Sequence, residues 1–414
     1  MSILLLHKKN LSRRRHLARA RRYADESGQR LLLIMKDPTW EKDYVDQVVV
    51  ADTGSMDDTL AAARDLAEPV DAVLTFAEAS VPAVARVAAH LGLPAVGERT
   101  AFLARDKHAM RTAVGDHAAQ PRFALAKDVD EARRAAARIG YPMILKPVIG
   151  TGSMYVRSVA DEDELVRHFE TIRRGSWDSL DYDPLHRGAR ERYDGALLLE
   201  EFLPGTEISV ESVVAGGRTT SFAVHDKPLP TGPTFEEVYA CTPTRLPAAT
   251  VERLYAATAA VHAAMGIEVG VTHVEFRLRD GEPVLLEAAA RMGGGPIYRS
   301  VQLSTGIDMV EAALDLACGR TPVIAPRPEP VAVGFRNIFP DRAGTLTAVR
   351  GVEEAKADPR VDEIEIYRKP GEYLKVPPQT FQGHGHLIFT VPSTDHLDGV
   401  FEEFRRLVRL EVTE

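Results

Sequence analysis

The chain has 414 residues, and at roughly 150 residues per domain this length predicts two or three domains. Hydrophobic residues make up 45% and charged residues 27%, as in ordinary globular proteins, and the net charge of -9 argues against a nucleic-acid-binding surface. Only two cysteines, Cys241 and Cys318, are present, which is too few for a disulfide framework. The sequence shows no signal-peptide pattern and no run of about 18 consecutive apolar residues, so we expect a cytoplasmic protein without membrane contact.

Short apolar runs alternate with helix-like segments over residues 1–100. Strand character is found at 2–7, 30–36, 47–52 and 72–76, and helical character at 12–26, 57–66 and 81–92. This alternation predicts a parallel sheet with helices on both faces. The first helix carries the basic run Arg13-Arg14-Arg15, which we interpret as a solvated face, with an anion site as the alternative.

The next segments are less regular. We expect helices over 100–114 and 129–139, and an apolar strand at 143–145. From 173 to 195 Arg, Asp, Gly, Tyr and Ser replace any periodic pattern, which predicts a surface loop, and the proline-rich segment 325–330 predicts a domain boundary. The expected division of the chain is 1–100, 101–195, 196–320 and 321–414.

A strand, a lysine and a glycine-rich turn follow one another at 144–156. Lys146 ends the strand, and Gly150, Gly152 and Ser153 lie in the turn. Glycines let a backbone approach polyphosphate closely and aim N–H groups at its oxygens, while the lysine adds positive charge. A plain hairpin turn with a solvated lysine is the alternative, so the phosphate interpretation depends on the metal site that follows in the chain.

A second apolar strand, 197–201, reaches a turn at Pro204-Gly205 and then resumes. Glu200 and Glu207 lie on either side of this bend. Exposed backbone at a bend can pair with the edge of an adenine, and a carboxylate beyond it can accept from ribose hydroxyls. The alternative is an acidic strand edge that favours solubility.

Glu275 and Glu287 flank an Asp280-Gly281 dipeptide between two strand-like runs, which predicts a hairpin. A three-residue loop centred on Gly281 would make the two carboxylates cross-strand neighbours, with Cβ atoms about 5 Å apart. Like charges so close repel, and a divalent cation between them resolves the repulsion. Carboxylate ligands without a nearby cysteine favour Mg²⁺, with Mn²⁺ as a substitute. A hairpin whose glutamates both face water is the alternative.

Taken in order, these segments resemble the ATP-grasp superfamily, and especially its carboxylate–amine ligases of the L-amino-acid ligase (dipeptide synthetase) type. The resemblance implies an α/β (α+β overall) ATP-grasp fold with an N-terminal Rossmann-like parallel-sheet domain and a C-terminal mixed lobe. It also implies ATP and Mg²⁺ as cofactors, a small carboxylate and an amine as substrates, and a homodimer. ATP would convert the acid to an acyl phosphate, which the amine attacks to form an amide, with release of ADP and phosphate.

The resemblance also assigns nucleotide-binding and metal-binding residues. It places ATP phosphates against Lys107 and Lys146, with the 150–153 loop closing over them. It places adenine and ribose against Glu200, Phe202, Leu203 and Glu207. Mg²⁺ would be ligated by Glu275 and Glu287.

Substrate contacts follow from the same resemblance. Arg291 would lie over the carboxylate that is phosphorylated, and the following Gly293 and Gly294 would let substrate reach its guanidinium; a flexible turn with a surface arginine is the alternative. Many family members have Asn at the position of Ala289, so the number of Mg²⁺ ions, one or two, stays open. His273, opposite Ala289 in the hairpin, is the candidate to fill the gap.

The segment 225–239 forms a loop over the substrates in similar ligases. Glu236 or Glu237 could there meet a substrate ammonium, and Lys227 could contact phosphate, while an exposed proline-rich loop is the alternative. Two other functions stay open. One is a purine-biosynthesis-type ATP-grasp ligase or carboxylase that acts on a ribonucleotide, and the other is a non-catalytic nucleotide-binding regulator.

Overall fold

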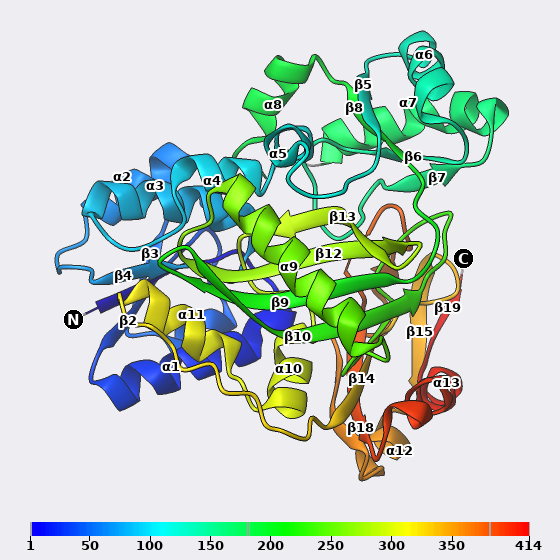
Figure 1. Cartoon of the computed structure of the whole chain (residues 1–414). Helices are drawn as coiled ribbons and strands as arrows, with labels where there is room; N and C mark the ends of the chain where they lie inside the picture. Colours follow the sequence, from blue (N-terminus) through cyan, green and yellow to red (C-terminus); the bar gives the residue numbers. More distant parts are fainter. Residues whose placement is uncertain (1, 180, 182, 381, 414) are drawn as a thin grey trace.

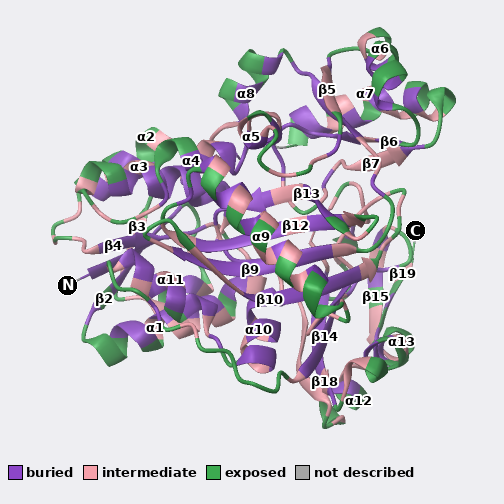
Figure 2. Cartoon of the chain, in the orientation of Figure 1, coloured by how far each residue is buried: buried purple, intermediate pink, exposed green. Residues whose placement is uncertain are grey.

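The computed structural model describes residues 2–179, 181, 183–380 and 382–413. These described residues form four sheets, of four, four, eight and three strands, whose arrangement can be followed in Figure 1. Buried residues line these sheets, while the outer faces of the helices are exposed (Figure 2). Within the described residues, no helix combines the length and the hydropathy that crossing a bilayer requires.

The N-terminal sheet has the order β3-β2-β1-β4, with all neighbours parallel. Successive residues of β1 point to opposite faces: Leu5 packs with helix α1, and Leu4 packs with α2 and α3. Both faces are therefore covered, which confirms the expected parallel sheet. The bounds are β1 Ser2–Leu6, α1 Arg14–Ser27, β2 Arg30–Met35, β3 Gln47–Val50, α2 Met56–Arg64, β4 Ala72–Leu74 and α3 Val81–Leu91.

A second sheet, of order β5-β8-β6-β7, carries the lysine and glycine-loop segment. Its elements and those leading to it are α4 Glu98–Leu103, α5 Lys107–Val114, β5 Phe123–Ala126, α6 Val129–Ile139, β6 Met143–Lys146, β7 Arg157–Val159, α7 Glu162–Ser179, α8 His186–Tyr193 and β8 Leu197–Glu201.

The predicted surface loop at 173–195 is wrong, because α7 and α8 occupy most of it. Leu180 and Tyr182 lie outside the described residues. Trp177 and Tyr193 are buried in one cluster with Leu198 of β8. These few large apolar residues are spread thinly among charged ones, so the pattern along the sequence was too weak to indicate helices.

The largest sheet has the order β13-β12-β9-β10-β11-β14-β18-β16 and continues past the proline-rich segment into the C-terminal part of the chain. The three-stranded sheet β17-β15-β19 lies beside it (Figure 1). The elements are β9 Glu207–Ala215, β10 Arg218–Leu229, β11 Tyr239–Thr242, α9 Ala248–Met265, β12 Gly270–Arg279, β13 Glu282–Ala289, α10 Ile297–Thr305, α11 Met309–Ala317, β14 Ala332–Asn337, β15 Gly344–Arg350, α12 Val352–Ala357, β16 Val361–Ile366, β17 Tyr373–Leu374, β18 Gly385–Val391, α13 Leu397–Leu407 and β19 Arg409–Thr413.

The basic run at the start of α1 lies beside the C-terminal lobe. Arg15 pairs with Glu363 of β16, and Arg14 lies 3.8 Å from Glu365. Arg13 is buried, with 5% of its surface exposed. The interpretation as a solvated helix face is therefore wrong for Arg13. Arg14 and Arg15 keep 46% and 37% of their side chains exposed, although each also lies beside an acid more than 340 residues away in sequence.

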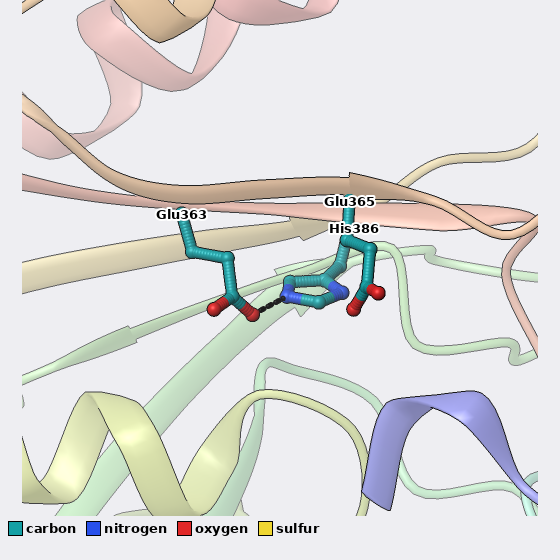
Figure 3. A group of neighbouring side chains, drawn as sticks. All are labelled: Glu363, Glu365 and His386. Atoms are coloured by element: carbon teal, nitrogen blue, oxygen red, sulfur yellow. Dashed lines mark hydrogen bonds and ion pairs between the residues drawn. The ribbon is translucent and has the colours of Figure 1, made fainter. Parts of the chain in front are cut away.

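Glu363, Glu365 and His386 form a compact group, with one ligand atom from each within 4.8 Å of the others (Figure 3). The His386 ring is hydrogen-bonded through Nε2 to Glu363 at 2.6 Å and through Nδ1 to the Tyr367 hydroxyl at 2.5 Å. Both ring nitrogens are thus engaged, and Arg14 and Arg15 supply positive charge. The group links α1 to the C-terminal lobe.

His262 of α9 makes the fold sensitive to acid. Its Nδ1 hydrogen-bonds the Thr219 hydroxyl at 2.8 Å, and burial lowers its pKa from 6.5 to about 4. Since the unfolded chain takes up this proton at higher pH than the folded one, acid favours unfolding. Stability should fall by about 2 kcal/mol between pH 7.5 and pH 5 through this group alone.

His262→Gln should remove that contribution, measured as the difference between denaturant unfolding free energies at the two pH values. His90→Gln, at an exposed position on α3, is the matched control and should leave the difference as in the wild type. An unchanged pH dependence in His262→Gln would contradict the assignment of a neutral, buried ring.

Candidate active site

The glutamate pair lies on a hairpin formed by β12 and β13. The connection is the two-residue Asp280-Gly281 turn, in which both residues have positive φ (52° and 83°), as a type I′ turn requires. Phe276 pairs with Leu285, and the next pair is Glu275 with Glu287, so Leu286 is an extra residue in the ladder. The predicted pairing is confirmed, but the predicted three-residue loop is wrong.

This bulge at Leu286 is what brings the carboxylates together. Without the extra residue, the register would slip by one and the two glutamates would no longer be partners. The carbonyl of Leu286 accepts a hydrogen bond of 2.6 Å from Arg111 of α5, which satisfies a group that the bulge leaves outside the ladder. The predicted register of His273 opposite Ala289 is also confirmed.

Each glutamate of the pair is held by a lysine from another part of the chain. Lys227 of β10 lies 2.6 Å from Glu275, and Lys107, the first residue of α5, lies 3.0 Å from Glu287. The positive charges offset the repulsion between the carboxylates. Oxygen-only donors at this position fit Mg²⁺, which prefers carboxylate, water and phosphate oxygens.

A cleft of about 720 Å³ lies between the second sheet and this hairpin. It brings together ten of the residues that the sequence indicated: Lys107, Lys146, Gly150, Ser153, Glu200, Phe202, Leu203, Glu207, Glu275 and Glu287. Gly152 lines the adjoining cavity instead. The glycine loop, the bend after β8 and the glutamate hairpin therefore face one space.

Glu200 at the base of this cleft is bound from two sides. Arg111 donates to both of its oxygens, at 2.8 and 3.2 Å, and Lys146 lies 2.7 Å away. Burial opposes the charge of Glu200, but the two cations outweigh it and lower its pKa to about 2. Lys146 is thereby fixed at the end of β6, where its ammonium group faces the cleft.

Lys107 connects the glycine loop to the glutamate hairpin. Its Nζ donates to the Gly150 carbonyl at 3.1 Å as well as to Glu287. The glycine loop and Glu287, the candidate metal ligand, thus both contact the ammonium group of Lys107. A ligand that draws Glu287 away would change the contact of Lys107 at the same time.

The far wall of the cleft contains an arginine that the sequence did not single out. The guanidinium of Arg277 lies 5.7 Å from the ring of Phe202 and 5.5 Å from that of Phe235, and donates to the Leu203 carbonyl at 2.6 Å. These contacts fix the bend after β8. The aromatic rings give the cleft an apolar side beside its charged one.

Lys227 is surrounded by acids. It lies 3.2 Å from Glu207, 3.3 Å from Glu237 and 2.6 Å from Glu275. Burial acts against its charge, but these carboxylates outweigh burial and raise the pKa of Lys227 well above its ordinary value. Three carboxylates thus gather around one buried lysine, at a position where a bound cation or ammonium can share them.

His273 has both ring nitrogens engaged by carboxylates. Nδ1 bonds Glu211, and Nε2 lies 3.1 Å from Glu275. Burial disfavours the charged ring, but the two carboxylates outweigh burial and raise its pKa to about 9. In this structure His273 therefore holds Glu275 in place.

A second cavity, of about 1940 Å³, opens from the cleft and shares Ser153, Glu207, Glu275 and Glu287 with it. The predicted substrate-contact residues that line it are Lys227, Glu236, Glu237, His273, Arg291 and Gly294. A Cβ on Gly294 would meet nothing within 4 Å, whereas one on Gly293 would lie 2.6 Å from Ile297. Gly293 is thus required by packing, and Gly294 faces open space.

Arg291 is positioned by an acid of the N-terminal domain. It forms an ion pair with Glu78, which precedes α3, and donates to the Met292 carbonyl at 2.7 Å. Glu78 also lies 3.1 Å from Arg105, which donates to the Gly150 carbonyl at 3.2 Å. This chain of contacts joins the arginine to the glycine loop, and no local pattern in the sequence pointed to Glu78.

Three family comparisons match successive parts of the chain. The ATP-grasp N-terminal domain matches residues 23–95, the ATP-grasp domain matches residues 139–299, and the L-amino acid ligase C-terminal domain 2 matches residues 336–413. The chain belongs to the ATP-grasp family. The predicted resemblance and fold class are confirmed, and the C-terminal match favours L-amino-acid ligases over purine-biosynthesis enzymes.

Individual relatives of this ATP-grasp protein agree with the family comparisons. The crystal structure of L-amino acid ligase from Bacillus licheniformis superposes with a TM-score of 0.82 at 21% identity, covering 100% of this chain and 99% of that one. Alanine–anticapsin ligase of Bacillus subtilis (strain 168) is 28% identical over 60% of this chain and 54% of its own length. Carnosine synthase 1 of Homo sapiens is 31% identical over 59% of this chain and 30% of its own length.

Proposed function

We propose that this ATP-grasp protein joins the carboxylate of an amino acid, or of a related small acid, to an amine, with formation of ADP and phosphate. The observation that carries the proposal is the meeting of three features at one cleft. These are the Lys146 and glycine-loop segment, the paired Glu275 and Glu287, and Arg291 in the adjoining cavity. The cleft suits a nucleotide, and the cavity is large enough for two small substrates.

The charged residues have different proposed roles, according to where they lie around the cleft and the cavity. Lys107 and Lys146 line the cleft, which supports their assignment to the ATP phosphates beneath the 150–153 loop. When bound between Glu275 and Glu287, Mg²⁺ would supply positive charge to the phosphate oxygens. Arg291 lies on the cavity side of this pair, where it can neutralise the acyl phosphate and the adduct that follows.

The acids around the cavity are suited to the amine. Glu236 and Glu237 line it, and Glu237 is held by Lys227 and by an amide hydrogen bond from Asn337 at 3.4 Å. A substrate ammonium can bind there before losing a proton. Attack by the neutral amine on the acyl phosphate forms the C–N bond and expels phosphate, so the carboxyl oxygen leaves with the phosphorus.

The direct test mixes the protein with ATP, Mg²⁺ and pairs of amino acids while released phosphate is measured. Release that requires one particular acid together with one particular amine supports the proposal. Nucleotide binding by calorimetry without release for any pair would favour a regulator instead. Mn²⁺ in place of Mg²⁺ should also sustain release.

Two further proposals come from the resemblance alone. A homodimer is expected, and sedimentation velocity of the full chain tests it. A cytoplasmic location is also expected, and fractionation of the source cells tests that. Neither is needed for the chemistry proposed above.

Glu78→Gln should lower kcat about 10- to 100-fold, because it removes the charge that orients Arg291. The KM for ATP should stay nearly constant, since Glu78 does not line the nucleotide cleft. Arg105 keeps its pairing with Asp183, so the variant should fold. Steady-state kinetics measures both constants.

Glu98→Gln, at an exposed position on α4, is the control for this substitution. It should leave kcat as in the wild type. An equal rise in the KM for ATP and fall in kcat for Glu78→Gln would contradict a role confined to Arg291.

A further inference from the structure

Arg13 is a buried arginine on the wall of the substrate cavity. It lies immediately before α1 with 5% of its surface exposed, and it lines the cavity of about 1940 Å³. Its Nη1 lies 2.9 Å from Nε2 of His16 and 3.4 Å from the Gly293 carbonyl. Arg13 therefore connects the N-terminal domain to the glycine run that follows Arg291.

Within the described part of the chain, no carboxylate pairs with Arg13. Two other buried arginines behave differently: Arg105 pairs with Glu78 and Asp183, and Arg111 pairs with Glu200. Arg336 also lacks an acid, but it donates to the Phe404 and Val408 carbonyls and does not line the cavity. A buried charge without a counterion is costly, so it persists where a ligand supplies the counterion.

The neighbours of Arg13 compensate its charge only in part. Burial, together with Arg13 itself, lowers the pKa of His16 well below its usual range, so the ring is neutral and accepts from the guanidinium. Burial and the nearby Arg291 also lower the pKa of Arg13, to about 9, and the opposing effect of Glu78 offsets this only in part. Both pKa values are lowered, which is the direction expected where no paired anion stabilises the positive charge.

The cavity lining around Arg13 also contains Lys8 and Lys9, which are less buried than Arg13, and several polar groups. Asn10 and Gln382 hydrogen-bond each other at 2.9 Å, and Tyr367 lies on the same wall. Glu78, an acid close enough to act on the charge of Arg13, is already shared between Arg291 and Arg105. The other acids that line the cavity do not form an ion pair with Arg13: Glu236 and Glu237 come from the segment between β10 and β11, and Glu207, Glu275 and Glu287 belong to the side shared with the cleft.

On the basis of the proposed ligase function, we infer that Arg13 binds a carboxylate that does not react, one carried by a substrate in this cavity. The reacting carboxylate belongs beside Arg291 and the glutamate pair, so a second carboxylate is left for Arg13. The amine substrate would then be an amino acid with a free α-carboxylate. A second acid group on the activated substrate has the same chemistry, and the experiment separates these two sources.

The experiment measures binding, so that it does not depend on turnover. The full chain with ADP and Mg²⁺ is titrated calorimetrically with proteinogenic amino acids and with the matching amino acid amides. Wild type should bind at least one amino acid about 30-fold or more tightly than its amide, and Arg13→Gln should reduce that ratio to near one. Arg13→Lys should keep part of the preference, and Arg22→Gln, at an exposed position on α1, should keep all of it.

Phosphate release then identifies which substrate carries the anion. If amidation of the amine substrate raises KM in wild type but not in Arg13→Gln, the anion belongs to the amine. If a dicarboxylic acid loses its advantage over a monoacid in Arg13→Gln, the anion belongs to the activated substrate. Thermal unfolding and ADP binding like those of wild type show that Arg13→Gln is folded.

Equal binding of acids and amides by wild type, or an unchanged preference in Arg13→Gln, would overturn the inference. So would the failure of every amino acid to bind wild type. A different outcome would contradict the proposed ligase function alone: amino acids bind more tightly than their amides, but no pair of substrates causes phosphate release.

Discussion

Replacing Glu287 with Gln should reduce the production of ADP and phosphate by about 1000-fold or more. The amide keeps the size of the side chain but removes one of the paired charges that face the cleft. A metal ion contributes several kcal/mol to stabilising phosphoryl transfer, and each 1.36 kcal/mol is about tenfold in rate. Coupled measurement of released phosphate across a range of Mg²⁺ concentrations gives both the rate and the metal affinity.

Folding of this variant should be little affected. Lys107 loses the carboxylate at 3.0 Å but keeps its bond to the Gly150 carbonyl. Glu282→Gln lies on the same hairpin, beyond the bulge, with 66% of its side chain exposed, and should retain the wild-type rate. Turnover close to wild type in Glu287→Gln, at ordinary Mg²⁺ concentration, would count decisively against a metal site on this hairpin.

Replacing Lys146 with Met should weaken ATP binding about 100-fold. The ammonium group faces the cleft, and a charge-assisted contact with phosphate is worth about 2 to 3 kcal/mol. The fold should tolerate the change, because Glu200 keeps both hydrogen bonds from Arg111. Calorimetric titration with ATP and Mg²⁺ measures the dissociation constant.

Arg111→Met should reduce stability as well as ATP affinity, unlike Lys146→Met. It removes the bidentate partner of Glu200 and the donor to Leu286, so it should lower the unfolding temperature as well as ATP affinity. Lys127→Met, at an exposed position after β5, should change neither quantity. If Lys146→Met binds ATP as tightly as the wild type, Lys146 does not bind phosphate and has only a structural role.

The β12–β13 hairpin shows which features can be predicted from residue spacing within a short segment and which cannot. An Asp-Gly dipeptide between strand-like runs predicts the turn, because both residues tolerate positive φ, and the pairing of Glu275 with Glu287 follows from their nearly equal distance from it. The bulge at Leu286 could not be predicted. Its carbonyl depends on Arg111, which is 175 residues away in the chain.

The amino-acid sequence by itself determined the N-terminal parallel sheet, the glycine loop after Lys146 and the glutamate hairpin, because turn chemistry and side-chain periodicity act between near neighbours. Only the tertiary structure decided how the cations and acids are shared. Arg13 meets Gly293 across 280 residues, and Glu78 meets Arg291 across the N-terminal domain boundary. Whether a charged side chain faces solvent, a counterion or a substrate depends on which distant backbone covers it, and that is settled when the domains pack together.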